Sequence, residues 1–117
     1  MNLKQDIQLT ALKSELLTNM HEYMLEVSAQ YKSADIEHCK QILDEHLRII
    51  SVANNEAQAL NCVRSTVMQL NTLNKKCGGE LIETGERELI CEFIIRASVL
   101  CGFNDKGADI TEVWREW

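Results

Sequence analysis

The sequence contains no proline, and its 5 glycines all lie after residue 77. Proline and glycine are the residues that most often interrupt or end a helix. Helices can therefore extend through the first 76 residues with few interruptions. The 117 residues, 45% of them hydrophobic, suit one folded domain over residues 1–117 and exclude a disordered tail or a fibrous repeat.

Long apolar runs are also missing. The densest one, residues 93–100, is interrupted by Arg96 and Ser98 and is far shorter than the roughly 20 residues that cross a bilayer. The first ten residues contain several polar side chains and no apolar segment typical of a signal peptide. We therefore expect a protein without a membrane partner, located in the cytoplasm.

Positive charge is scarce. The chain has 12 lysines and arginines against 18 aspartates and glutamates, which gives a formal net charge of -6. A negative surface repels the phosphates of nucleic acids and of anionic membranes. We expect no nucleic acid as a partner, and a basic protein is the more natural one.

Five cysteines are present, but none forms a CxxC pair. This odd, unpaired set argues against a disulfide framework and a zinc cage, and favours reduced thiols. Cys77 lies beside Gly78, so we expect it to be the exposed and most reactive thiol. The other four lie in apolar helical surroundings: Cys39, Cys62, Cys91 and Cys101.

Common signatures of enzymes and of metal sites are absent from the sequence. His38 and His46 are eight residues apart, which places them on different faces of a helix and not together on a metal. His38 is adjacent to Cys39, but neighbouring helical residues point about 100° apart and do not form a dyad. We expect no catalytic residues, no cofactor and no metal, with His46 at the edge of the core and His38 in solvent.

Apolar residues recur at steps of three and four along most of the chain, which predicts helices. The first spans about residues 3–31, and the second follows a break at 32–34 with Ser33 or Asp35 as its N-cap. Asn55, with Gln58 three residues later, predicts a capping box for the third helix, whose core stripe starts at Leu60. Gly78 ends that helix.

The rest of the chain predicts one long helix and one short one. Thr84 is expected to cap a fourth helix that ends at Gly102. Asp109, with Glu112 three residues later, resembles a capping box for a short terminal helix. The expected fold is all-α: an antiparallel bundle of four main helices plus a short C-terminal helix.

The segment 80–117 has the most unusual composition. Five glutamates fall within thirteen residues, and the two tryptophans of the chain follow near its end. Charge steers the encounter of proteins, and tryptophan supplies buried contact area. These residues form the candidate partner-binding site: Glu83, Glu86, Glu88, Trp114 and Trp117. Acids also favour helix N-termini, and terminal tryptophans often close a bundle, so a structural explanation stands beside this one.

The run Leu81-Ile-Glu-Thr-Gly-Glu-Arg-Glu and the closing Asp109-Ile-Thr-Glu-Val-Trp-Arg-Glu-Trp resemble the C-terminal third of small uncharacterised bacterial helical proteins. The resemblance covers about forty residues and implies a bacterial, cytoplasmic protein. It implies no activity and no catalytic residues.

The leading hypothesis is a non-enzymatic module that binds another protein, similar at the level of class to an immunity protein or antitoxin that inhibits a basic partner. An alternative is a structural or regulatory protein that forms a homodimer through its fourth helix. A third is a small enzyme that uses His38 or His46 with a carboxylate.

Overall fold

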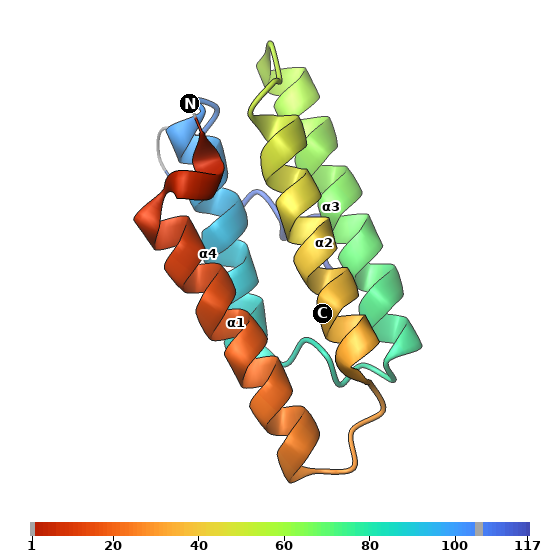
Figure 1. The fold of residues 1–117 in the computed structure, drawn as a ribbon. Coiled ribbons are helices and arrows are strands. Elements are labelled where there is room, and N and C mark those ends of the chain that lie inside the picture. The colour runs from red at the N-terminus through yellow and green to blue at the C-terminus, as the bar shows by residue number, and fades with distance from the viewer. Residues whose placement is uncertain (1, 105–106) are drawn as a thin grey trace.

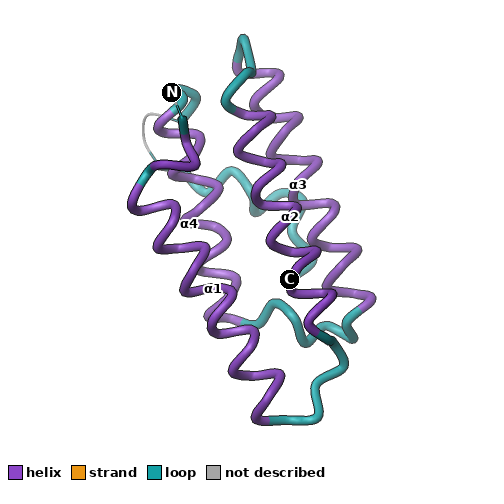
Figure 2. The backbone as a smooth tube through the Cα atoms, in the orientation of Figure 1, coloured by secondary structure: helices purple, strands orange, loops and turns teal. Residues whose placement is uncertain are grey.

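In the computed structural model, residues 2–104 and 107–117 are described, and these residues form helices and turns with no strand (Figures 1 and 2). The expected all-α fold is confirmed for this part of the chain. The elements are a short 3-10 helix, η1 (Leu3–Gln5), and four α-helices: α1 (Ile7–Glu26), α2 (Ser33–Ile50), α3 (Glu56–Lys76) and α4 (Thr84–Leu100).

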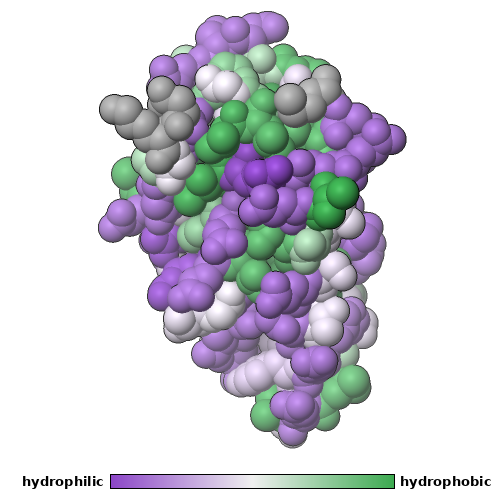
Figure 3. Space-filling view, turned by 90° about the vertical axis from the view of Figure 1, so that its left-hand side faces the viewer, coloured by the Kyte–Doolittle hydropathy of each residue, from purple (hydrophilic) through white to green (hydrophobic). Residues whose placement is uncertain are grey.

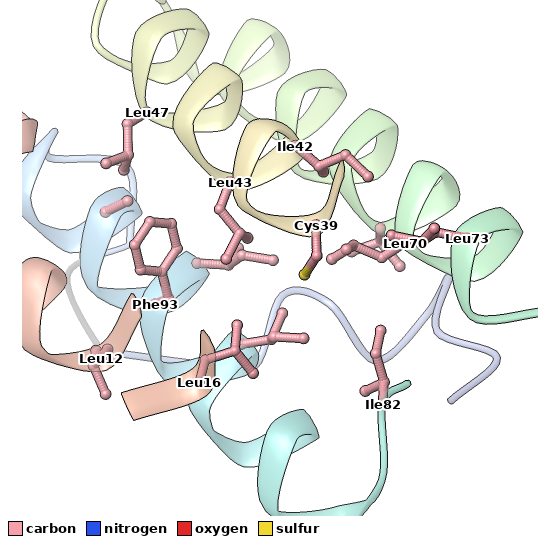
Figure 4. Packing of buried hydrophobic residues seen from close by; sticks show 14 of the residues in the cluster. Leu12, Leu16, Cys39, Ile42, Leu43, Leu47, Leu70, Leu73, Ile82 and Phe93 are labelled. Carbon is pink, nitrogen blue, oxygen red and sulfur yellow. The ribbon is translucent and has the colours of Figure 1, made fainter. Parts of the chain in front are cut away.

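The four helices form two closely packed pairs, α1 with α4 and α2 with α3. In Figure 1, α1 and α3 run downward while α2 and α4 run upward. The pairs are joined mainly through α1 and α2. In the core, Leu16 of α1 and Phe93 of α4 point toward Leu43 of α2 (Figure 4), and all three side chains are at most 1% exposed. Burial of large apolar side chains such as these stabilises the fold by about 1.5–3 kcal/mol each.

The first long helix is shorter than expected, because it starts at Ile7 and not near residue 3. The carboxylate of Asp6 accepts the backbone N–H of Leu9 at 2.9 Å, so Asp6 is the N-cap of α1. Arg96 of α4 donates two hydrogen bonds to the same carboxylate, at 2.9 and 3.0 Å. The start of α1 is therefore fixed to α4 by a residue that the helical spacing does not reveal.

The same helix ends at Glu26, although the spacing of apolar residues continues to Tyr31. Val27 is 44% exposed and extended, whereas Tyr31 is buried at the end of a loop. The Tyr31 hydroxyl donates to the carbonyl of Met20 at 3.0 Å. Tyr31 thus reaches the core by folding back and not by continuing the helix.

The predicted helix caps are confirmed only in part. Asn55 caps α3 as expected by accepting the N–H of Gln58 at 2.9 Å. Ser33 and Thr84, however, are the first residues of α2 and α4 and not their N-caps. Asp35 lies within the first turn of α2, where its carboxylate accepts the N–H of Lys32 at 3.0 Å. Acids within a first turn stabilise the positive helix end without being the cap residue.

Two further expectations concern α3 and the end of α4. Gly78 has a φ of +67°, which confirms the left-handed stop after α3. Leu60 is 39% exposed, so its expected place in the core stripe is wrong. The buried face of α3 begins one residue earlier, at Ala59. α4 ends at Leu100, two residues before Gly102.

The expected short C-terminal helix is not confirmed, because residues 112–114 form a turn. Asp109 accepts the N–H of Thr111 at 3.0 Å and the Thr111 hydroxyl at 2.6 Å. The carboxylate therefore bonds two residues ahead, as in a turn, and not three ahead as in a capping box. We call residues 107–117 the C-terminal strap; in Figure 1 it passes behind the helix pairs.

Candidate functional site

Glutamates gather around the start of α4, and we call Glu80, Glu83, Glu86 and Glu88 the acidic end. Glu86 accepts the backbone N–H of Glu83 at 3.1 Å, so it also stabilises the N-terminus of α4. In the described part of the chain, none of the four forms a salt bridge, whereas Asp6, Asp35, Asp44, Glu45 and Asp109 all do. The negative charge of the acidic end is therefore not neutralised by a partner within the described residues.

The charges of three of these glutamates, Glu80, Glu83 and Glu86, act on two tyrosines. The rings of Tyr23 and Tyr31 are stacked, with centroids 6.2 Å apart and planes at 13°. Burial raises the pKa of Tyr31 to about 12, and the charges of Glu86 and Glu80 add to the effect. Burial also raises the pKa of Tyr23, with Glu80, Glu83 and Glu86 contributing. The negative charges of these carboxylates thus act on an aromatic pair made by Tyr23 of α1 and Tyr31 of the loop that follows α1.

Two loops hold this arrangement together. The backbone N–H of Gln30 donates to the Glu80 carboxylate at 2.7 Å, which joins the α1–α2 loop to the α3–α4 loop. The side chain of Gln30 also lies over Gly78, where a Cβ atom would be only 2.3 Å from its Oε1 atom. Glycine is therefore favoured at this position by its positive φ, and a Cβ atom there would displace the end of the Gln30 side chain. These contacts set the position of Tyr31 and Glu80 relative to each other.

The two tryptophans lie elsewhere, on the strap. Both are partly buried against the core. Asn71 of α3 donates to the carbonyl of Trp114 at 2.8 Å. Within the described residues, no hydrogen bond or ion pair joins Trp114 or Trp117 to Glu83, Glu86 or Glu88. The structure therefore brings the glutamates together with tyrosines. Sequence reasoning missed Tyr23 and Tyr31, because in the sequence they look like ordinary members of an apolar helical stripe.

Comparison with models of known protein families, with curated proteins and with solved structures finds no match.

The two histidines of α2 lie in different surroundings. His38 is exposed as expected, whereas His46 is 1% exposed and lies deeper than the core edge. His46 Nδ1 is 2.6 Å from the Thr66 hydroxyl oxygen and 3.4 Å from the Cys62 sulfur. Burial lowers the pKa of His46 to about 4, so its ring is neutral at pH 7. Among residues 2–104 and 107–117, no three metal-ligating side chains gather.

The expectation for Cys77 is wrong, since its side chain is 1% exposed. Cys77 follows α3 directly and caps its C-terminus, where it faces the core. Burial raises the pKa of its thiol, which makes it less reactive. The two half-exposed thiols are instead Cys91 and Cys101.

No helix within the described residues has the length and apolar character needed to span a bilayer.

Proposed function

We propose that this chain is a protein-binding module, built as an antiparallel helical bundle, that receives a basic segment of another protein at its acidic end. The supporting observation is the group of four glutamates without ion pairs within the described residues, three of which, Glu80, Glu83 and Glu86, act electrostatically on the stacked Tyr23 and Tyr31. An immunity-type inhibitor in a bacterial cytoplasm fits this role.

Charge and aromatic surface have complementary effects at such a site. Unpaired carboxylates speed the encounter with a cationic partner and set its orientation. The face of a tyrosine ring attracts a lysine or arginine side chain by about 0.5–1 kcal/mol at an exposed site. Tyr23 is partly exposed and Tyr31 is buried behind it, so the pair offers one accessible and rigid ring.

Dimerisation through α4 has less support. The large apolar residues Ile90, Phe93 and Ile94 are buried in the core of the chain itself. On the outer side of α4, Ile95 and Val99 line a groove together with the polar residues Gln8, Glu92 and Arg96. Figure 3 shows hydrophobic and hydrophilic residues intermixed on this side of the molecule.

An enzyme based on His46 has little support too, because the hydrogen-bonding neighbours of its ring are Thr66 and Cys62 and not a carboxylate.

A charge-reversal experiment tests the proposal. The probe is a dye-labelled peptide of ten lysine and arginine residues, titrated with the full chain and followed by fluorescence anisotropy. The test variant combines Glu83→Lys and Glu88→Lys, two exposed glutamates of the acidic end. Glu83 is the N-cap residue of α4, so circular dichroism first checks that the variant keeps its helix content. Glu86 is left unchanged because it stabilises the start of α4.

The matched control combines Glu15→Lys and Glu112→Lys, two exposed glutamates outside the acidic end with the same change in net charge. We expect the affinity to fall about tenfold in the test variant and about twofold in the control, because each lost or reversed contact is worth about 0.5–1 kcal/mol. Added salt should weaken binding of the unaltered chain. Equal losses in the two variants would contradict the proposal.

A further inference from the structure

The ring of Tyr23 is held in place from one side. Tyr31 stacks on it, with centroids 6.2 Å apart and planes at 13°. Tyr31 is itself fixed, because its side chain is buried and its hydroxyl donates to the carbonyl of Met20 at 3.0 Å. Tyr23 remains partly exposed near the end of α1. It therefore offers a rigid aromatic surface on the side that Tyr31 does not cover.

Negative charge surrounds this tyrosine pair from the loop before α4 and from the first turn of that helix. The Glu80 carboxylate accepts the N–H of Gln30 at 2.7 Å, and Gln30 directly precedes the buried tyrosine in the chain. In Figure 1, the end of α1, the loop that follows it and the start of α4 lie at the same end of the bundle. Burial raises the pKa of the partly exposed tyrosine, and the charges of Glu80, Glu83 and Glu86 raise it further.

The C-terminal strap shows how the chain itself fills a similar combination of ring and carboxylate. The guanidinium carbon of Arg115 lies 5.6 Å from the centre of the Trp117 ring, and the same guanidinium donates to the Asp109 carboxylate at 3.1 Å. In the part of the chain that the structure describes, no lysine or arginine lies over Tyr23 in this way. The ring and the carboxylates at the acidic end therefore have no such cation among the described residues.

Arginine fits this combination better than lysine does. A guanidinium is planar and weakly hydrated, so its face can stack on an aromatic ring while its edge donates to a carboxylate. A lysine ammonium is a compact and strongly hydrated charge without a flat face. The carboxylates attract both side chains, whereas the aromatic ring distinguishes between them.

We propose that the basic segment received at the acidic end presents an arginine, whose guanidinium stacks on Tyr23 and donates to a carboxylate of the acidic end. This inference rests on the proposed function and names the side chain of the partner that the site selects. Tyr23 is then the specificity-determining residue, while the glutamates supply an attraction that is common to lysine and arginine.

Two peptides of equal charge test this selection. One dye-labelled peptide contains only arginine and the other, of the same length, contains only lysine. Each is titrated with the full chain, and fluorescence anisotropy gives its affinity. The quantity compared between variants is the ratio of the arginine affinity to the lysine affinity, because a general preference of carboxylates for arginine enters this ratio equally in every variant.

Two substitutions separate the ring from its hydroxyl. Tyr23→Leu removes the ring, and Tyr23→Phe keeps the ring without the hydroxyl. We expect the ratio to fall about two- to fivefold in Tyr23→Leu and to stay unchanged in Tyr23→Phe, since this is the contribution of a cation over an exposed aromatic ring. Circular dichroism checks that both variants keep their helix content.

Nuclear Overhauser contacts provide a measurement that needs no substitution. In the complex of the unaltered chain with the arginine peptide, contacts should join the Tyr23 ring protons to the arginine side chain. This measurement decides the question if Tyr23→Leu does not fold.

The selection of arginine is wrong if the ratio is unchanged in a folded Tyr23→Leu variant, if it falls equally in Tyr23→Phe, or if the Overhauser contacts are absent. The proposed function survives those results as long as the variant with Glu83→Lys and Glu88→Lys binds both peptides more weakly than its matched control. Equal losses in that variant and its control would remove the proposed function and the selection of arginine together.

Discussion

Because His46 is buried, the free energy of unfolding depends on pH between about 4 and 6.5, a range in which few other side chains titrate. Its pKa is lowered from 6.5 to about 4 because the folded protein removes the ring from water. The unfolded chain therefore binds a proton at a higher pH than the folded chain does. The stabilisation is complete above pH 6.5 and is lost as the pH falls toward 4.

The magnitude follows from the shift. A difference of about 2.5 pKa units corresponds to about 3.4 kcal/mol of unfolding free energy, lost in full only below pH 4. At pH 5 the loss is about 2 kcal/mol, since the unfolded histidine is then almost fully protonated and the folded one is mostly neutral. This is a large part of the 5–15 kcal/mol typical of a folded domain.

Urea unfolding followed by circular dichroism, from pH 7.5 to pH 4.5, measures the effect. The reference variant is His46→Leu, which does not titrate and leaves every carboxylate in place. Hydrogen bonds and ion pairs lower the pKa values of Asp6 and Asp35 below 3.8, so the stabilisation from these two carboxylates is kept until the pH falls toward 3.8. Both proteins contain these carboxylates and lose this stabilisation equally. The unaltered chain should lose about 2 kcal/mol more than His46→Leu between pH 7.5 and pH 5. Parallel pH profiles for the two proteins would refute the reasoning.

Two other predictions concern packing and thiols. Leu43→Ala should lower the unfolding free energy by about 2–5 kcal/mol, because Leu43 is fully buried. Leu60→Ala should lower it by about 0.5 kcal/mol or less, because Leu60 is 39% exposed, and similar losses for the two variants in urea unfolding would contradict the assigned face of α3. A small maleimide should label Cys91 and Cys101 before Cys77 in the native protein, as followed by mass spectrometry of peptides, and early labelling of Cys77 would show that it is not buried.

Several features that depend on local chemistry could be predicted from the sequence. The apolar spacing located four helices, Asn55 marked the start of α3, and Gly78 marked its end. These features depend on residues a few positions apart, so a single sequence reveals them.

What the sequence did not reveal depends on contacts between distant segments. Asp6 is the N-cap of α1 and also bonds Arg96, 90 residues away. Tyr31 lies outside α1 and packs on Tyr23. The strap remains a turn held by Asn71 and not a helix. The acidic end could be predicted as a group of charges, but its aromatic neighbours could not, because the α1–α2 loop has to fold before they meet.

A titration followed by nuclear magnetic resonance tests the central claim about the acidic end most directly. The uniformly labelled chain is titrated with the lysine and arginine peptide at low and high salt. The account predicts shift changes concentrated at Tyr23, Gln30 and residues 83–88, which fade as salt is added. Changes spread evenly over all acidic surfaces, or centred on the outer faces of α2 and α3, would contradict it.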